Sequence, residues 1–171
     1  LVSAVSDPTN VFARGQMLLA STYAGIGFGN AGVHLPHGMS YPVAGMVSKF
    51  VPKGFPRPKD NNEPIIPHGM SVILNAPAVF RFTASANPDL HLLAASLMGV
   101  DVRGVSIDQA GQILAQAIID LMKATGIPNG LSAVGYQPVD IPKLVNATLP
   151  QHRVTKLSPI PVDSKVLTHL F

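Results

Sequence analysis

The chain has 171 residues, of which 47% are hydrophobic and only 12% are charged, whereas average soluble domains carry about 25% charged residues. This composition excludes intrinsic disorder, which needs low hydrophobicity and high net charge. The net charge of +3 without any Lys or Arg cluster argues against nucleic-acid binding. Because cysteine is absent, disulfides, zinc–thiolate sites and a cysteine nucleophile are excluded as well.

Helical periodicity dominates the chain, and we expect an all-α domain, a bundle of about seven helices. Thr9 or Asn10 is a plausible N-cap for the first helix, and residues 51–66 form a proline-rich, solvent-facing loop. There is no internal repeat architecture, and residues 71–74 are the one candidate for a strand. The expected helices span about 10–31, 37–50, 69–85, 88–99, 106–125, 140–148 and 162–171.

Local sequence signals predict further details of several of these helices. Pro77 is expected to kink the helix at 69–85, and Asn87-Pro88 provides an N-cap with a first-turn proline. Ser106 to Gln109 fits a capping box at the start of the clearest amphipathic helix. The apolar stripe of that helix consists of Ile113, Leu114, Ala117, Ile118, Leu121 and Met122.

Two long stretches carry no charged residue. The first spans the 34 positions from 15 to 48, and the second the 17 positions from 64 to 80. A transmembrane helix needs about 20 mostly apolar residues, so the first stretch is long enough. Its polar residues, seven glycines, Pro36 and Pro42 favour buried helices of a larger protein instead. No signal peptide is visible at the N-terminus.

Two of the six histidines occur in copies of one pentapeptide. Residues 36–40 and 67–71 both read Pro-His-Gly-Met-Ser, which places His37 and His68 at the starts of two expected helices. A neutral imidazole is a good ligand for iron, zinc or nickel, and two helix ends can converge on one ion. The alternative is a pair of buried, hydrogen-bonded histidines that cap helices. Asp60 and Glu63 are weaker candidates for further ligands.

Longer motifs around these histidines resemble the iron-dependent (group III) alcohol dehydrogenases. The glycine-rich segment 20–32 and the segments 34–42 and 67–72 match this family, and 130–136 and 148–156 resemble its hydroxyacid-oxoacid transhydrogenase branch especially. The resemblance covers residues from about 10 to 160.

The resemblance implies the helical C-terminal domain of an enzyme that binds NAD(P) with a separate N-terminal domain. The family holds its metal, for which Fe²⁺ is the expectation, between the two domains with one Asp and three His. Imidazole and carboxylate ligands also accept Zn²⁺, which is the alternative. It implies His37 and His68 as metal ligands and Phe28 as a lining residue of the substrate pocket near the nicotinamide. Tyr41 stands where several members have a proton-relay histidine, so we expect a catalytic hydrogen bond from its phenol. His34 stands where many members have glycine, and we place it in the substrate pocket.

The family's Asp-x-x-x-His pair does not occur before Arg14, and the nucleotide-binding domain is absent. Residues 1–171 are therefore expected to form a single helical metal-binding domain of a longer protein, which fits Leu1 as the first residue. By itself it should bind metal weakly and lack dehydrogenase activity.

We expect the longer protein to be a homo-oligomer that acts on small alcohols or hydroxy acids, such as 4-hydroxybutyrate. It is expected in the cytoplasm, or in mitochondria if the source is eukaryotic, without a nucleic-acid or membrane partner. Arg81, Arg103 and Arg153 are the candidates to pair with a substrate carboxylate. The rival hypothesis is a stand-alone, non-catalytic helical binding or structural module.

Overall fold

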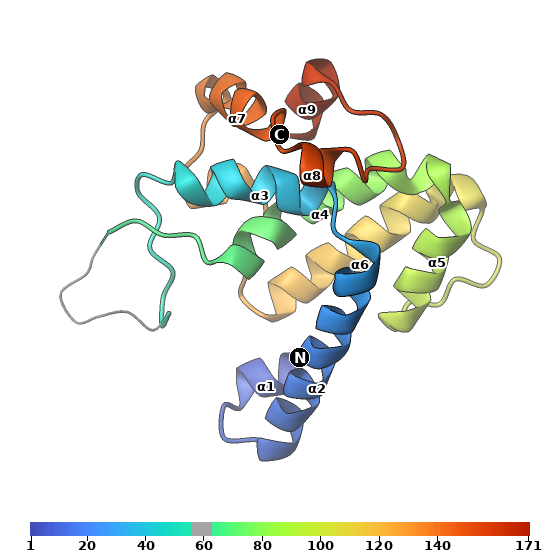
Figure 1. Ribbon diagram of the computed structural model, residues 1–171. Coiled ribbons are helices and arrows are strands. Elements are labelled where there is room, and N and C mark those ends of the chain that lie inside the picture. Colours follow the sequence, from blue (N-terminus) through green and yellow to red (C-terminus); the bar gives the residue numbers. More distant parts are fainter. Residues whose placement is uncertain (56–62) are drawn as a thin grey trace.

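The computed structural model describes residues 1–55 and 63–171. In those ranges it has nine α-helices and no strand (Figure 1). The prediction of an all-α fold is confirmed. The expected number of about seven was too low, because α1 (Val2–Ser6) and α8 (His152–Thr155) are too short to show a hydrophobic period.

The N-terminal helices agree with the sequence signals. The long helix α2 (Val11–Ala31) begins where Asn10 accepts a hydrogen bond on its Oδ1 from the backbone N–H of Ala13 at 2.9 Å. The next helix, α3 (Leu35–Gly45), starts two residues earlier and ends five residues earlier than the expected 37–50. The described parts of the expected loop, residues 51–55 and 63–66, contain no helix.

The central helices correct two local predictions. Helix α4 (His68–Thr83) contains residues 71–74, so the strand alternative for them is wrong, and it runs through Pro77. Helix α5 (Pro88–Leu97) is capped by the Asn87 side chain, as expected. Helix α6 (Ala110–Ala124) follows a 3₁₀ turn at Ile107–Gln109, and the Ser106 side chain makes no capping hydrogen bond. The predicted capping box is wrong because this tighter first turn replaces the α-helical one.

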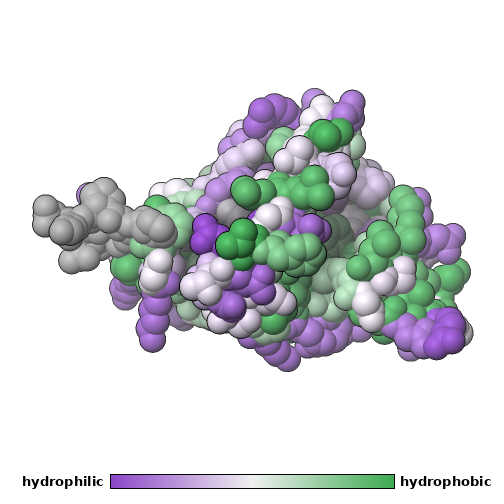
Figure 2. Space-filling view, turned by 90° about the horizontal axis from the view of Figure 1, so that it is seen from below, coloured by the Kyte–Doolittle hydropathy of each residue, from purple (hydrophilic) through white to green (hydrophobic). Residues whose placement is uncertain are grey.

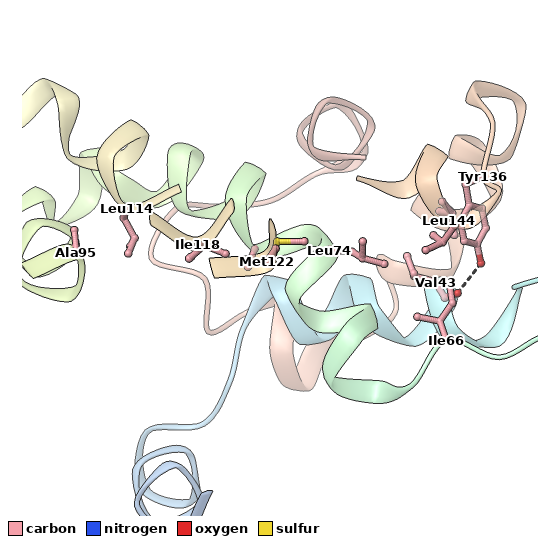
Figure 3. Packing of buried hydrophobic residues seen from close by; sticks show 11 residues of the cluster. Val43, Ile66, Leu74, Ala95, Leu114, Ile118, Met122, Tyr136 and Leu144 are labelled. Carbon is pink, nitrogen blue, oxygen red and sulfur yellow. Dashed lines mark hydrogen bonds between the residues drawn. The ribbon is translucent and has the colours of Figure 1, made fainter. Parts of the chain in front are cut away.

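The apolar stripe of α6 faces the core as predicted, since each of its six side chains is buried or half-buried. Helix α4 packs between α3 and α6, and α5 covers the other side of α6. Above α3 lie α7 (Ile141–Thr148), α8 and α9 (Ser164–Leu170) (Figure 1). Figure 3 shows the core as a row of side chains that ends where Tyr136 donates a 2.6 Å hydrogen bond to the Val43 carbonyl.

Helix α2 extends away from this core. It packs on α1 and has no buried residue in the described structure, although its sequence is largely apolar (Figure 1). Viewed from the side on which α1 and α2 project, the molecule shows hydrophobic residues interspersed with hydrophilic ones (Figure 2). None of the described helices combines the length and the hydropathy that crossing a bilayer requires. The exposed large side chains of α2 are Val11, Phe12, Leu18, Leu19, Tyr23, Ile26 and Phe28.

Candidate metal and substrate site

The two Pro-His-Gly-Met-Ser copies fold in the same local way at the starts of α3 and α4. In each copy the serine hydroxyl donates back to the histidine carbonyl, from Ser40 to His37 at 2.7 Å and from Ser71 to His68 at 2.8 Å. Both serines are fully buried. These bonds satisfy buried hydroxyl groups and tie each serine to the first turn of its helix.

The two copies bring their histidines together. Helices α3 and α4 pack against each other, and the ring centroids of His37 and His68 lie 5.3 Å apart at an angle of 60°. Tyr41 lies one turn after His37 on α3, and its ring stacks on His68 with centroids 6.3 Å apart and planes 19° apart. Residues that are 31 positions apart in the chain therefore form one aromatic cluster.

This cluster lines a pocket of about 490 Å³, which is within the range of small-molecule sites. Phe28 forms the edge of the pocket on α2, and this residue is 57% exposed. Arg153, from α8, adds a positive charge. The remaining lining residues are Gly32, Val33, Val154 and Leu157. Three of the predicted site residues from α3 and α4, together with Phe28, thus face one pocket.

The surroundings of His37 favour the neutral form of its ring. Burial is the main cause that lowers the pKa of His37 below its ordinary value of 6.5, and the neighbouring His68 lowers it further. A histidine whose pKa is lowered is neutral near pH 7, and a neutral imidazole has a lone pair available for a metal ion.

His34 lies beside this pocket rather than among its lining residues. It is the N-cap residue of α3, and its ring packs edge-on against Phe80 with centroids 6.4 Å apart. Burial, then the nearby His37 and His91, lowers the pKa of His34. Its Nδ1 is buried without a hydrogen-bond partner in the described structure. A role for His34 in the substrate pocket stays a prediction.

The residues present fit a metal ion as part of a ligand set. His37 and His68 offer two converging imidazoles, the ligand type that iron and zinc accept. Across residues 1–55 and 63–171, no group of three or more His, Cys, Asp or Glu side chains could hold a metal ion. Glu63 is exposed before α4, and Asp60 lies outside the described residues. An ion bound by both histidines would therefore need ligands beyond this part of the chain.

Arg153 is the one functional candidate that sequence patterns could not single out. Its Nη2 donates a 3.3 Å hydrogen bond to the Tyr41 hydroxyl, although the two residues are 112 positions apart. Helix α8 has only four residues, so it shows no periodicity that would have revealed its orientation. Only the packing of α8 on α3 brings Arg153 to the pocket.

Comparison with known families agrees with this geometry. Residues 1–49 and 64–171 match the model of the Fe-containing alcohol dehydrogenase family, C-terminal. The chain belongs to this family. The predicted resemblance is confirmed, and the two Pro-His-Gly-Met-Ser copies lie within the matched residues.

Similar proteins show which members it resembles. It is 54% identical over 155 residues, 91% of this chain, to the probable mitochondrial hydroxyacid-oxoacid transhydrogenase of Dictyostelium discoideum, covering 28% of that protein. It is 48% identical over its whole length to the mitochondrial hydroxyacid-oxoacid transhydrogenase of Homo sapiens, covering 36% of it. The chain thus spans about a third of the length of these relatives.

Solved structures share the fold. A 1,3-propanediol oxidoreductase superposes with a TM-score of 0.83 at 27% identity, covering 99% of this chain and 40% of that one. An alcohol dehydrogenase from Oenococcus oeni superposes with a TM-score of 0.84 at 24% identity, again covering 99% of this chain and 40% of that one. The second likeness shows the fold alone.

Proposed function

We propose that this chain forms the helical, metal-binding part of an Fe²⁺-dependent dehydrogenase that acts on small alcohols or hydroxy acids. The observation that carries the proposal is the convergence of His37 and His68, from two copies of one pentapeptide, in a pocket with Tyr41. The names of the similar proteins, hydroxyacid-oxoacid transhydrogenases, support hydroxy acids as the substrate class. NAD(P) is the proposed hydride carrier, held mainly by parts of the protein outside this chain.

In this proposal His37 and His68 hold the ion through their neutral imidazoles. A divalent iron would supply Lewis-acid chemistry, which lowers the pKa of a substrate hydroxyl and favours loss of hydride from its carbon. The phenol of Tyr41 is placed to donate a hydrogen bond to the reacting oxygen from beside His68. Phe28 shapes the apolar edge of the pocket. NAD(P), when bound, would supply the acceptor for the hydride, and the hydroxyl proton would leave to water.

The proposal is tested in the natural-length protein that contains this chain. We expect one bound iron per chain and NAD(P)-dependent oxidation of a hydroxy acid such as 4-hydroxybutyrate. Replacing either pocket histidine, His37→Ala or His68→Ala, should weaken metal binding by at least about 100-fold, since a direct ligand matters at least as much as its outer partners. His169→Ala is the matched control, because this exposed histidine lies on α9, away from the pocket.

Metal content by elemental analysis and NAD(P)H formation by absorbance separate the outcomes. Unchanged metal content in both pocket variants contradicts the ligand assignment. A wild-type protein that binds metal but turns over neither alcohols nor hydroxy acids supports the rival interpretation, a non-catalytic helical module.

The 171-residue chain alone is proposed to bind metal weakly and to lack dehydrogenase activity, because its described residues bring together only two ligands. Robust NAD(P)-dependent turnover by this chain would overturn that expectation. A mitochondrial location is proposed because both similar transhydrogenases are named mitochondrial. Homo-oligomerisation is a further proposal, which sedimentation of the natural-length protein tests.

A further inference from the structure

We propose that Arg153 binds the carboxylate of a hydroxy-acid substrate, and that it thereby selects hydroxy acids over uncharged alcohols. This inference rests on the proposed function, because it assigns the substrate's second contact in the same pocket. It starts from the position of the guanidinium, which lines the pocket of about 490 Å³ together with His37 and His68.

Among the arginines that the structure describes, the other three are directed elsewhere. Arg14 donates to the Pro8 carbonyl beside α1 at 2.9 Å. Arg81 donates to the Gln112 side chain at 2.7 Å and lines a different groove between α4 and α9. The guanidinium of Arg103 forms an ion pair with Asp101 at 2.6 Å. Arg153 alone among them faces the pocket that contains the paired histidines.

Among the described residues, no acidic side chain balances the charge of Arg153. No acidic residue lines the pocket, and the two ion pairs formed by described residues involve other cations. The contact with Tyr41 joins one Nη to a neutral hydroxyl at 3.3 Å. A guanidinium has five N–H donors in a planar fork, so this contact leaves donors for a carboxylate, which accepts two parallel hydrogen bonds.

The backbone that carries Arg153 is held firmly against the site. Val154, the next residue, is buried, and Gly38 on α3 allows α8 to approach closely. A Cβ added at Gly38 would lie 3.0 Å from the Val154 Cγ2. Because Gly38 directly follows His37, the packing of α8 on α3 fixes the distance between the arginine backbone and the metal-binding histidine. A rigid spacing of this kind suits a substrate whose hydroxyl and carboxylate bind at the two ends.

The first experiment compares substrates in the natural-length holoenzyme. The pair is 4-hydroxybutyrate and 1-butanol, which has the same four-carbon chain without the carboxylate. Arg153→Gln should lower kcat/KM for 4-hydroxybutyrate by about 10- to 100-fold, mainly through KM, and change kcat/KM for 1-butanol by less than about threefold. Arg153→Lys should recover part of the loss, because it keeps the charge but not the planar fork. Arg103→Gln is the control and should leave both substrates unchanged.

The second experiment measures binding without turnover. Calorimetric titration of butyrate, which has the carboxylate but no hydroxyl, should give a Kd at least about tenfold weaker in Arg153→Gln than in the wild type. An equal loss for both substrates, or unchanged discrimination together with an unchanged Kd for butyrate, overturns the assignment. If the wild type turns over neither substrate but binds butyrate through Arg153, the proposed function fails and the carboxylate site stands. If the wild type turns over the substrates normally and Arg153→Gln changes neither turnover nor the Kd for butyrate, the carboxylate site fails and the proposed function stands.

Discussion

Gly32, which links α2 to α3 at the edge of the pocket, should tolerate no side chain. Its φ of 74° and ψ of −170° lie in a region that only glycine adopts readily, and its N–H donates to the Phe28 carbonyl at 2.8 Å. An added Cβ would lie 2.6 Å from the Leu157 Cδ1, but that side chain is half exposed and can rotate away. The backbone strain should therefore dominate, and we expect Gly32→Ala to lower the free energy of unfolding by about 2 kcal/mol.

Urea unfolding of the natural-length protein, followed by circular dichroism, measures this cost. Gly29→Ala is the control, because Gly29 lies within α2 and, apart from its chain neighbours and the backbone of its own helix, no described atom comes within 4 Å of an added Cβ. The free energy of unfolding of the control should rise by up to about 1 kcal/mol, because alanine has a higher helix propensity than glycine. The reasoning is refuted if Gly32→Ala stays within about 0.5 kcal/mol of the wild type. A double-mutant cycle with Leu157→Ala tests the cause: a coupling energy near the whole 2 kcal/mol would mean that the clash, not the backbone, sets the cost.

Two further substitutions test the packing of the core. Gly111→Ala should destabilise the protein by about 1–3 kcal/mol, because the new Cβ would lie 2.8 Å from the Ala84 Cβ on a neighbouring helical segment. Gly69, also the second residue of its helix, has open space around it, so Gly69→Ala should be neutral or stabilising in the same urea assay. Burial raises the pKa of Tyr136 from 10.0 to about 12, so its neutral phenol stabilises the fold fully below pH 10. That contribution, at most about 2.7 kcal/mol, should be lost as the pH rises from 10 to 12, and Tyr136→Phe should remove this pH dependence of the unfolding free energy.

The helices were predictable where the sequence carries a local signal. Asn10 and Asn87 cap their helices as expected, because an N-cap depends on contacts within four residues. Ser106 failed in the same role, since the choice between an α-helical and a 3₁₀ first turn depends on tertiary packing that a capping motif does not encode. The short helix that carries Arg153 has too few residues for any period to emerge.

The site was predictable to the extent that its residues share a motif. The repeated pentapeptide placed His37 and His68 at two helix starts, and the packing of α3 on α4 then joined them. Arg153 had no such signal, because it and two other arginines were equivalent candidates in the sequence. What distinguishes it is a contact with Tyr41 across 112 positions of the chain, and contacts at that range follow only from the folded topology.

The uncharged stretch at residues 15–48 acquires a more specific meaning from the structure. It includes most of α2, which has no buried residue, and all of α3, most of which is buried. Burial in the described structure therefore cannot explain why these parts of both helices lack charge. Both helices line the pocket, however, with Phe28 from one and His37 and Tyr41 from the other. An acidic side chain on either helix could neutralise the guanidinium that α8 supplies. On the proposed assignment, the absence of acidic side chains from this stretch leaves the guanidinium of Arg153 available to the substrate carboxylate. A cation that is not neutralised in a partly apolar pocket attracts an anion more strongly than it would in water.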